Sequence, residues 1–346
     1  MELIDLTNNI SQTKLQEINN YLKEGKLIIF PTETVYGLGA IATDDKAVKK
    51  IYIAKGRKSD NPLIVHLSSV SEIEKYAHIE NEIERKLINT FMPGPFTIIL
   101  KKKDNIPSAV SGGLDTVGIR VPSNKIAHSI LSHNNLPIAA PSANISGRPS
   151  GTNIEDIYNE FKDKVSCIIN GGNSQIGLES TVVRVVDNIP IILRPGYITK
   201  EDILNTIGSV KVDDNIFKKD VDTPLSPGMK YKHYAPAATL TLLCGSREDY
   251  ADRVNEYYET LQRAGEEDGF YAMCFDEDVS LLEAPTISYG VAYDYPSQAQ
   301  NLFDVLRQLD KLQATEVYVH APEPEEMGLA VYNRLLRAAA FRVVQL

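Results

Sequence analysis

Short apolar runs alternate with segments of helical periodicity over residues 1–207. Apolar runs bounded by turn residues are typical of buried strands, and apolar positions three and four apart indicate helices. The loops between several strands are too short for a crossover helix. The pattern therefore predicts an α/β domain with a mixed twisted sheet and helices on its faces. The expected strands are Leu27–Phe30, Leu63–Leu67, Phe96–Leu100, Val117–Val121, Ile138–Ala140, Val165–Ile169, Thr181–Val186 and Ile191–Leu193, and the expected helices include Asp45–Ala54, Ile83–Phe91, Lys125–Ser132 and Ile154–Phe161.

The periodicity fails between Gly208 and Pro236, where prolines and paired charged residues interrupt it. We interpret residues 208–236 as a linker. A stretch of this length without periodicity is usually functional or disordered. One hypothesis is that residues near Ser226–Pro236 form a lid over a pocket of the first domain. The alternative is a simple spacer.

Residues 237–346 show a second strand and helix rhythm, which is typical of a small parallel sheet. We expect a smaller Rossmann-like α/β domain here. Its expected strands are Leu240–Leu243, Phe270–Cys274, Thr286–Ser288 and Val317–Val319, and its expected helices lie near Glu248–Arg263, Ser297–Lys311 and Gly328–Ala340.

Charge separates the two parts of the chain of 346 residues. The residues before Ala237 contain 22 Lys, 6 Arg and 27 acidic residues, which gives a net charge of +1. The residues from Ala237 onward contain 1 Lys, 7 Arg and 19 acidic residues, which gives −11. The difference is consistent with separate selection on two domains or with a chain joined from two sources, and we leave both open.

Targeting and metal signals are lacking in the sequence. Met1–Leu6 has no basic stretch followed by an apolar run, and no segment approaches the ~18 apolar residues of a membrane span. We expect a cytoplasmic protein without membrane contact. Cys167, Cys244 and Cys274 form no C-x-x-C spacing, so we expect neither a disulfide framework nor a protein metal site, and we interpret each as a small buried residue.

Polar, glycine-containing segments follow three expected strands, at residues 31–39, 55–62 and 141–152. Ligand sites of α/β proteins commonly form at such positions. The chain has neither a Walker nor a dinucleotide-binding glycine motif, so a phosphate group would have to be bound by another type of loop. Turn geometry and a solvated basic loop are the alternatives. His66 is consistent with a satisfied core residue or with a site residue.

Taken together, these segments resemble the YrdC-type threonylcarbamoyl-AMP synthase family, in its long form with a linker and a C-terminal domain. The matching motifs occur in order over nearly the whole first domain and the linker. They are P-T-E-T-V-Y-G-L-G at 31–39, K-G-R at 55–57, N-P-L-I-V-H at 61–66, P-G-P-F-T at 93–97, G-I-R-V-P at 118–122, A-P-S-A-N-I-S-G at 140–147, E-S-T-V at 179–182, L-R-P-G at 193–196 and H-Y-A-P at 233–236.

The resemblance implies roles for individual residues. The family's K-x-R…S-x-N signature corresponds to Lys55, Arg57, Ser142 and Asn144, and Lys55 and Arg57 would act catalytically by stabilising charge on the phosphates. The implied ATP contacts are Arg57, Asn61, Thr116, Ser142, Asn144, Ser150, Arg194 and Tyr234. The implied threonine contacts are Thr34, His66, Arg120, Ala140 and Ser180.

The implied reaction joins L-threonine, bicarbonate or CO2, and ATP into threonylcarbamoyl-AMP, with release of pyrophosphate. Mg2+ would accompany ATP, held by phosphate oxygens and water. The product would serve a downstream tRNA threonylcarbamoyl transferase complex that modifies an adenosine of tRNA, and binding of tRNA itself would be weak.

Two other classes compete with this interpretation. The first is an RNA-binding module without its own ATP chemistry, although a net charge of +1 gives little attraction to a phosphate backbone. The second is a hydrogenase-maturation carbamoyltransferase, which carries a related domain. Such proteins add zinc-finger regions, and this sequence has no paired C-x-x-C motifs.

Overall fold

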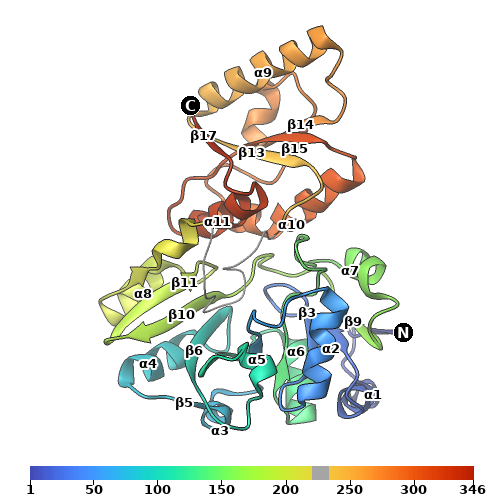
Figure 1. Ribbon diagram of the computed structural model, residues 1–346, viewed down its shortest axis with the longest axis vertical. Helices are drawn as coiled ribbons and strands as arrows, with labels where there is room; N and C mark the ends of the chain where they lie inside the picture. Colours follow the sequence, from blue (N-terminus) through green and yellow to red (C-terminus); the bar gives the residue numbers. More distant parts are fainter. Residues whose placement is uncertain (220–233) are drawn as a thin grey trace. The chain divides into compact units, whose positions relative to one another are not determined.

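The computed structural model describes residues 1–219 and 234–346. Its contacts divide the chain into two compact units (Figure 1). Among the described residues, the N-terminal unit comprises residues 1–146 and 150–219, and the C-terminal unit comprises residues 147–149 and 234–346.

A mixed sheet of 12 strands runs through the described residues of the N-terminal unit. Its order is β1-β9-β2-β3-β8-β4-β7-β6-β10-β11-β12, with β5 paired to β6. Parallel and antiparallel pairs both occur, which confirms the predicted fold class. The strands are β1 (Glu2–Asp5), β2 (Ile28–Phe30), β3 (Gly37–Ile41), β4 (Ile64–His66), β5 (Ala77–His78), β6 (Phe96–Lys102), β7 (Thr116–Arg120), β8 (Ile138–Ala139), β9 (Cys167–Asn170), β10 (Thr181–Val186), β11 (Ile189–Arg194) and β12 (Lys211–Val212).

Apolar residues on both sheet faces hold the helices of this unit. Alternation along β2 sends Ile28 and Phe30 into a cluster with α1 and α6, whereas Ile29 packs in the cluster that contains α2. The central strands are therefore covered on both faces, as their continuous apolar sequences predict. The helices are α1 (Gln12–Lys23), α2 (Asp45–Lys55), α3 (Ile73–Tyr76), α4 (Glu82–Phe91), α5 (Ser108–Ser111), α6 (Lys125–Asn134), α7 (Ile154–Phe161) and α8 (Lys200–Ile207), with 3-10 turns η1 (Val70–Glu72) and η2 (Asp214–Phe217).

Strands β1, β3, β5 and β12 were not expected from the sequence. Two glycines conceal β3, because glycine is depleted in strands. A Cβ at Gly39 would lie 2.8 Å from Ile138 Cγ2 and 2.9 Å from Phe30 Cε1, so close packing requires glycine there. Strand β12 lies inside the predicted linker and pairs with β11, so the N-terminal unit continues beyond residue 207.

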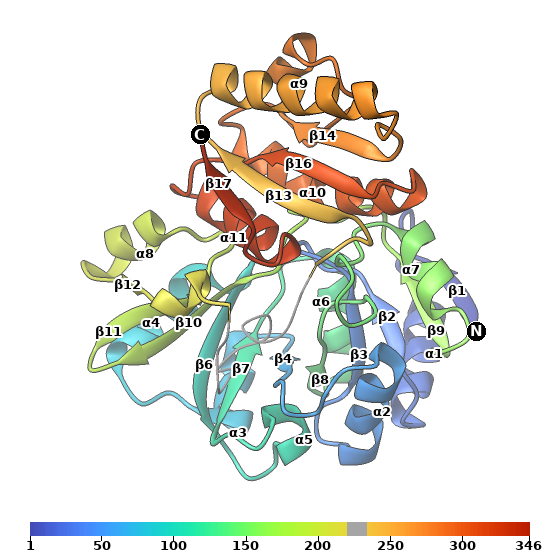
Figure 2. The same cartoon turned by 45° about the horizontal axis from the view of Figure 1, so that its top comes forward.

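The C-terminal unit has five parallel strands in the order β15-β14-β16-β13-β17. Helix α9 covers one face of this sheet, and α10 and α11 cover the other (Figure 2). This arrangement confirms the predicted small parallel domain, with β17 as an additional edge strand. The elements are β13 (Thr239–Cys244), α9 (Arg247–Ala264), β14 (Phe270–Cys274), η3 (Asp276–Leu281), β15 (Thr286–Ser288), α10 (Tyr295–Lys311), β16 (Glu316–His320), α11 (Gly328–Ala338) and β17 (Val343–Gln345).

All three cysteines are free thiols, and Cys167 and Cys274 are buried. Burial raises the pKa of both buried thiols to about 12, so neither is a reactive thiolate at neutral pH. Among residues 1–219 and 234–346, no helix has the length and apolar character needed to cross a membrane.

Candidate active site

Backbone hydrogen bonds join two of the polar segments that the sequence predicts, at 31–39 and 141–152. Tyr36 N donates to Gly151 O at 3.1 Å, and Ala143 N donates to Tyr36 O at 2.7 Å. Gly177 N donates to Thr34 O at 3.1 Å. The loop between β2 and β3 is therefore fixed to the loop after β8 and to the segment that precedes β10.

Lys55 holds the loop after β8 from the end of α2. Its Nζ donates to the carbonyl of Ser142, to the carbonyl of Asn144 at 2.6 Å and to Asn144 Oδ1 at 3.3 Å. Ser142 Oγ in turn donates to Asn144 Oδ1 at 2.6 Å. Lys55 is only 1% exposed. The K-x-R and S-x-N parts of the signature are thus brought together, with the Lys55 ammonium oriented toward the loop.

Arg57 follows a left-handed turn that ends α2. Gly56 supplies φ of +62°, a value that favours glycine. The half-buried Arg57 guanidinium donates through Nη2 to the carbonyls of Asn61 at 3.3 Å and Pro62 at 3.1 Å. Because of this turn, the Arg57 side chain points in a different direction from that of Lys55.

Asn61 carries a buried side-chain acceptor. Its side chain is 1% exposed, and within the described part of the chain Oδ1 has no hydrogen-bond partner. Such an atom needs an explanation, because an unsatisfied buried acceptor costs about 1–3 kcal/mol. Thr116 lies at the start of β7 beside Pro62, where a cavity of about 10 Å³ can hold roughly one water.

A buried ion pair forms at the end of β7. Arg120 Nη2 donates to Glu33 Oε1 at 2.7 Å, and Nη1 donates to Thr34 Oγ1 at 2.8 Å. Burial would raise the pKa of the Glu33 carboxyl, but the charge and hydrogen bond of Arg120 lower it below its usual value. Arg120 Nε also donates to Gly94 O at 3.3 Å. These contacts use three of the five N–H donors of the guanidinium.

His66 lies opposite Arg120 in the β4–β7 register and is buried. Burial, reinforced by the nearby Arg120 charge, lowers the pKa of His66 to about 3. The imidazole is therefore neutral at physiological pH. Its Nδ1 lies 3.2 Å from Ile64 O, and the Phe30 ring meets it edge-on with a centroid separation of 5.9 Å.

Ser180 and Arg194 form a second buried group. Arg194 Nε donates to Ser180 O at 3.0 Å, and its Nη2 donates to Ser180 Oγ at 3.1 Å. The Thr97 hydroxyl lies 2.7 Å from Ser180 Oγ. Ser150 is fully buried and donates from Oγ to Glu179 Oε1 at 2.6 Å.

Ala140 and Tyr234, the remaining predicted site residues, belong to different units. Ala140 follows β8 and donates its N–H to Ile64 O at 2.9 Å, so it lies beside β4. Tyr234 belongs to the C-terminal unit, where its ring lies 5.2 Å from that of Phe303. Its expected contact with ATP stays a prediction. The rest of the lid hypothesis, residues 226–233, lies outside the described residues.

Three partners of the site were not singled out from the sequence: Glu33, Thr97 and Glu179. Each orients a predicted site residue through the contacts above. All three lie within the matching motifs at 31–39, 93–97 and 179–182. No local sequence pattern identifies Glu33, because its partner Arg120 lies 87 positions further along the chain.

No group of three or more His, Cys, Asp or Glu residues suited to hold a metal occurs among the residues that the structure describes. Two acids of the site, Glu33 and Glu179, are engaged with Arg120 and Ser150.

The fold and these contacts define an α/β protein whose mixed sheet carries a group of buried polar side chains, followed by a parallel α/β domain. A family model for Sua5, YciO and YrdC, described as "Telomere recombination", matches residues 20–196. A second model, "Threonylcarbamoyl-AMP synthase, C-terminal domain", matches residues 198–340. The chain belongs to the threonylcarbamoyl-AMP synthase family, in its long form, which confirms the resemblance.

Relatives match both units along the whole chain. The threonylcarbamoyl-AMP synthase of Pyrococcus abyssi is 38% identical over 344 residues, which cover 99% of each chain. That of Bacillus subtilis is 39% identical over 346 residues, with 99% and 98% covered. The crystal structure of P. abyssi Sua5 complexed with L-threonine superposes with a TM-score of 0.93 at 38% identity, with 100% of both chains covered.

Proposed function

We infer that the protein is a threonylcarbamoyl-AMP synthase that makes threonylcarbamoyl-AMP and pyrophosphate from L-threonine, bicarbonate or CO2, and ATP. The observation that carries this conclusion is the end-to-end match to synthases of the same name. The related structure with L-threonine supports threonine as a substrate.

The reaction has two bond-forming steps. The threonine amine attacks the carbon of CO2, loses a proton and becomes a carbamate. A carbamate oxygen then attacks the α-phosphorus of ATP, and the bond to the bridging oxygen of pyrophosphate breaks. No covalent enzyme intermediate is needed, so the protein contributes positioning and charge stabilisation. Mg2+ enters as part of the substrate, bound to the triphosphate.

The proposed nucleotide site surrounds the loop after β8. Arg57 is suited to phosphate oxygens, because a guanidinium can present two parallel N–H donors. Asn61 Oδ1, which has no hydrogen-bond partner among residues 1–219 and 234–346, supports a ligand donor next to it. Lys55 acts here by holding Ser142 and Asn144 in place. Thr116, Ser150, Arg194 and Tyr234 complete the proposed set.

The proposed threonine site lies at the ends of the parallel strands β4 and β7, beside the antiparallel strand β8. Arg120 is suited to the substrate carboxylate, and Thr34 and Glu33 orient it. A neutral His66 can accept or donate one hydrogen bond without adding charge. Ala140 and Ser180 complete the proposed set.

The product would pass to a transferase that modifies tRNA, and the cytoplasmic location expected from the sequence remains a prediction. Pyrophosphate release from ATP tests the proposal. Release should require threonine and bicarbonate together. Release that is unchanged when either is omitted would contradict the reaction. Tight, steeply salt-dependent tRNA binding without ATP turnover would instead favour an RNA-binding module.

A further inference from the structure

The C-terminal unit contains a cavity at the carboxyl ends of its parallel strands. The cavity has a volume of about 190 Å³. This volume is about ten times the volume that one water molecule needs. Its walls come from the ends of β13 and β16, from the residues after β14, and from the start of α10. Ligands of open parallel sheets bind at this edge.

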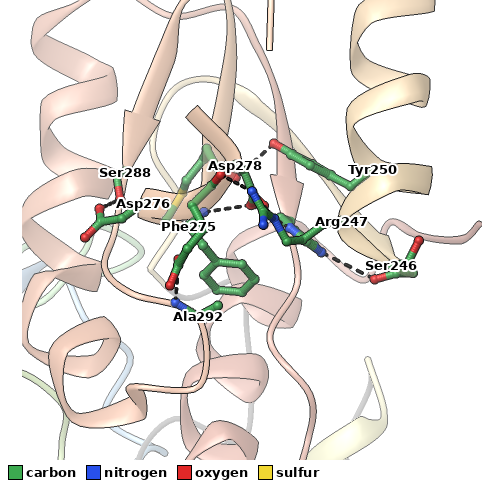
Figure 3. Close-up of polar contacts among 12 residues, drawn as sticks. Ser246, Arg247, Tyr250, Phe275, Asp276, Asp278, Ser288 and Ala292 are labelled. Carbon is green, nitrogen blue, oxygen red and sulfur yellow. Dashed lines mark hydrogen bonds and ion pairs between the residues drawn. The ribbon is translucent and has the colours of Figure 1, made fainter. Parts of the chain in front are cut away.

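A network of buried polar contacts lies beside this cavity and shares Arg247 and His320 with its lining (Figure 3). Asp278 is fully buried and accepts from His320 Nδ1 at 2.7 Å and from Arg247 Nε at 3.1 Å. Burial would raise the pKa of the Asp278 carboxyl, but His320, the Phe275 backbone and Arg247 together lower it. The network therefore fixes the first residue of α9 against the ends of β14 and β16.

Arg247 lines the cavity next to its ion-pair partner Asp278. Its side chain is 40% exposed, and the contacts described here use Nε for Asp278 and Nη2 for the Glu277 carbonyl. It is also the first residue of α9, after the N-cap Ser246, where backbone N–H groups point outward. These two features together favour an anionic group such as a phosphate.

Gln298 gives the cavity an unpartnered acceptor. The residue is fully buried, and its side chain lines the cavity. Its Nε2 donates to Val291 O at 2.8 Å, which fixes the amide orientation. In the described chain Oε1 has no hydrogen-bond partner, although it is buried. A ligand that donates an N–H group would satisfy this atom.

Aromatic rings supply the remaining surface. Phe275, Tyr293 and Tyr295 line the cavity, and Tyr293 is 77% exposed. An exposed aromatic ring beside an apolar one provides a stacking surface for a planar ligand. The acidic Glu323 also lines the cavity and can accept from hydroxyl groups.

We propose that this cavity binds a nucleoside monophosphate whose base carries an exocyclic amine. The phosphate meets Arg247 and the start of α9, the base stacks on the tyrosines, and the amine donates to Gln298 Oε1. This site is separate from the site proposed in the N-terminal unit and does not depend on the reaction proposed there.

Hydrogen exchange of the full chain, with AMP, IMP and inorganic phosphate as probes, tests the proposal. AMP should slow exchange in residues 245–249 and 291–298. IMP carries a carbonyl in place of the amine, so it should need at least a tenfold higher concentration. Equal protection by AMP and IMP, protection by phosphate alone, or no protection would overturn the proposal. Exchange in the N-terminal unit serves as a separate readout of the nucleotide site there.

Two variants localise the effect. Tyr293→Ala removes an exposed ring and should weaken AMP protection of these segments on the order of tenfold. Arg253→Ala, on the exposed surface of α9 and outside the cavity lining, is the matched control and should leave protection unchanged. Melting temperatures of both variants should equal that of the parent protein. Unaltered AMP protection in Tyr293→Ala would contradict the stacking geometry.

Discussion

At the scale of single residues, the two cations of the K-x-R motif differ in their surroundings. Lys55 is buried and donates to the loop after β8, whereas Arg57 is half-buried beyond the turn at Gly56. The sequence predicted both residues but assigned them the same task on the phosphates. It could not separate them, because burial depends on where residues 142–144 fold.

Arg57→Ala should lower the rate by on the order of 10²–10³, because one contact to developing charge is lost. Its melting temperature should change little, since the side chain is only half-buried. Steady-state pyrophosphate release and thermal unfolding measure the two effects. Lys58→Ala, at an exposed neighbouring position, is the control. A fall in melting temperature that accounts for the lost activity would show a structural role.

Lys55→Ala should reduce both activity and stability. The change leaves the carbonyls of Ser142 and Asn144 without their buried ammonium, which should cost at least ~2 kcal/mol. Denaturant unfolding measures the cost. Unchanged unfolding together with a lost rate would instead place the Lys55 ammonium on the substrate.

The buried His66 should make the protein sensitive to mild acid. Its folded pKa of about 3 lies below the unfolded value of about 6.5, so protons favour the unfolded state. The contribution of His66 to the free energy of unfolding is fully present above pH ~6.5. It decreases as the pH falls toward ~3, by up to ~1.4 kcal/mol per pH unit. Glu33, with its lowered pKa, adds a loss only below its unfolded value of about 4.5.

Unfolding measured between pH 7 and pH 5 isolates the histidine effect. His66→Gln should flatten the pH dependence in this window, whereas His128→Gln, at an exposed position, should not. A parent protein with pH-independent stability in this window would show that His66 titrates normally in the folded state.

At the scale of elements, the sequence located the strands that carry the site but missed β3 and β12. The glycines of β3 conceal it, although Gly39 is needed for close packing on Phe30 and Ile138. Strand β12 has two residues, which is too short for a recognisable period. The Glu33–Arg120 pair joins residues 87 positions apart, a contact that no local pattern specifies.

Helix α8 and strand β12 should be required for a stable N-terminal unit. Ile203 and Ile216 are buried, and the Thr181 hydroxyl donates to Ile198 O at 2.7 Å. A chain ending at Gly196 should therefore melt at a lower temperature than one ending at Lys219. Equal melting temperatures would show that residues 197–219 are dispensable for this unit.

At the scale of the whole molecule, the two units have different chemistry. The N-terminal unit carries the buried cations and hydroxyls of the proposed reaction, and the C-terminal unit carries the cavity beside Arg247 and Gln298. The sequence predicts both folds but no role for the second, because Gln298 becomes a candidate only when the structure shows that its buried Oε1 has no partner among the described residues.

The protein is proposed to join threonine, bicarbonate and ATP. Mass spectrometry of the product formed from 13C-bicarbonate tests this reaction. We expect an adenylate that contains threonine and gains one mass unit from the label, formed together with pyrophosphate and absent when threonine is omitted. An adenylate that contains threonine but no label would contradict the proposed reaction, because the carbamate would then not be an intermediate.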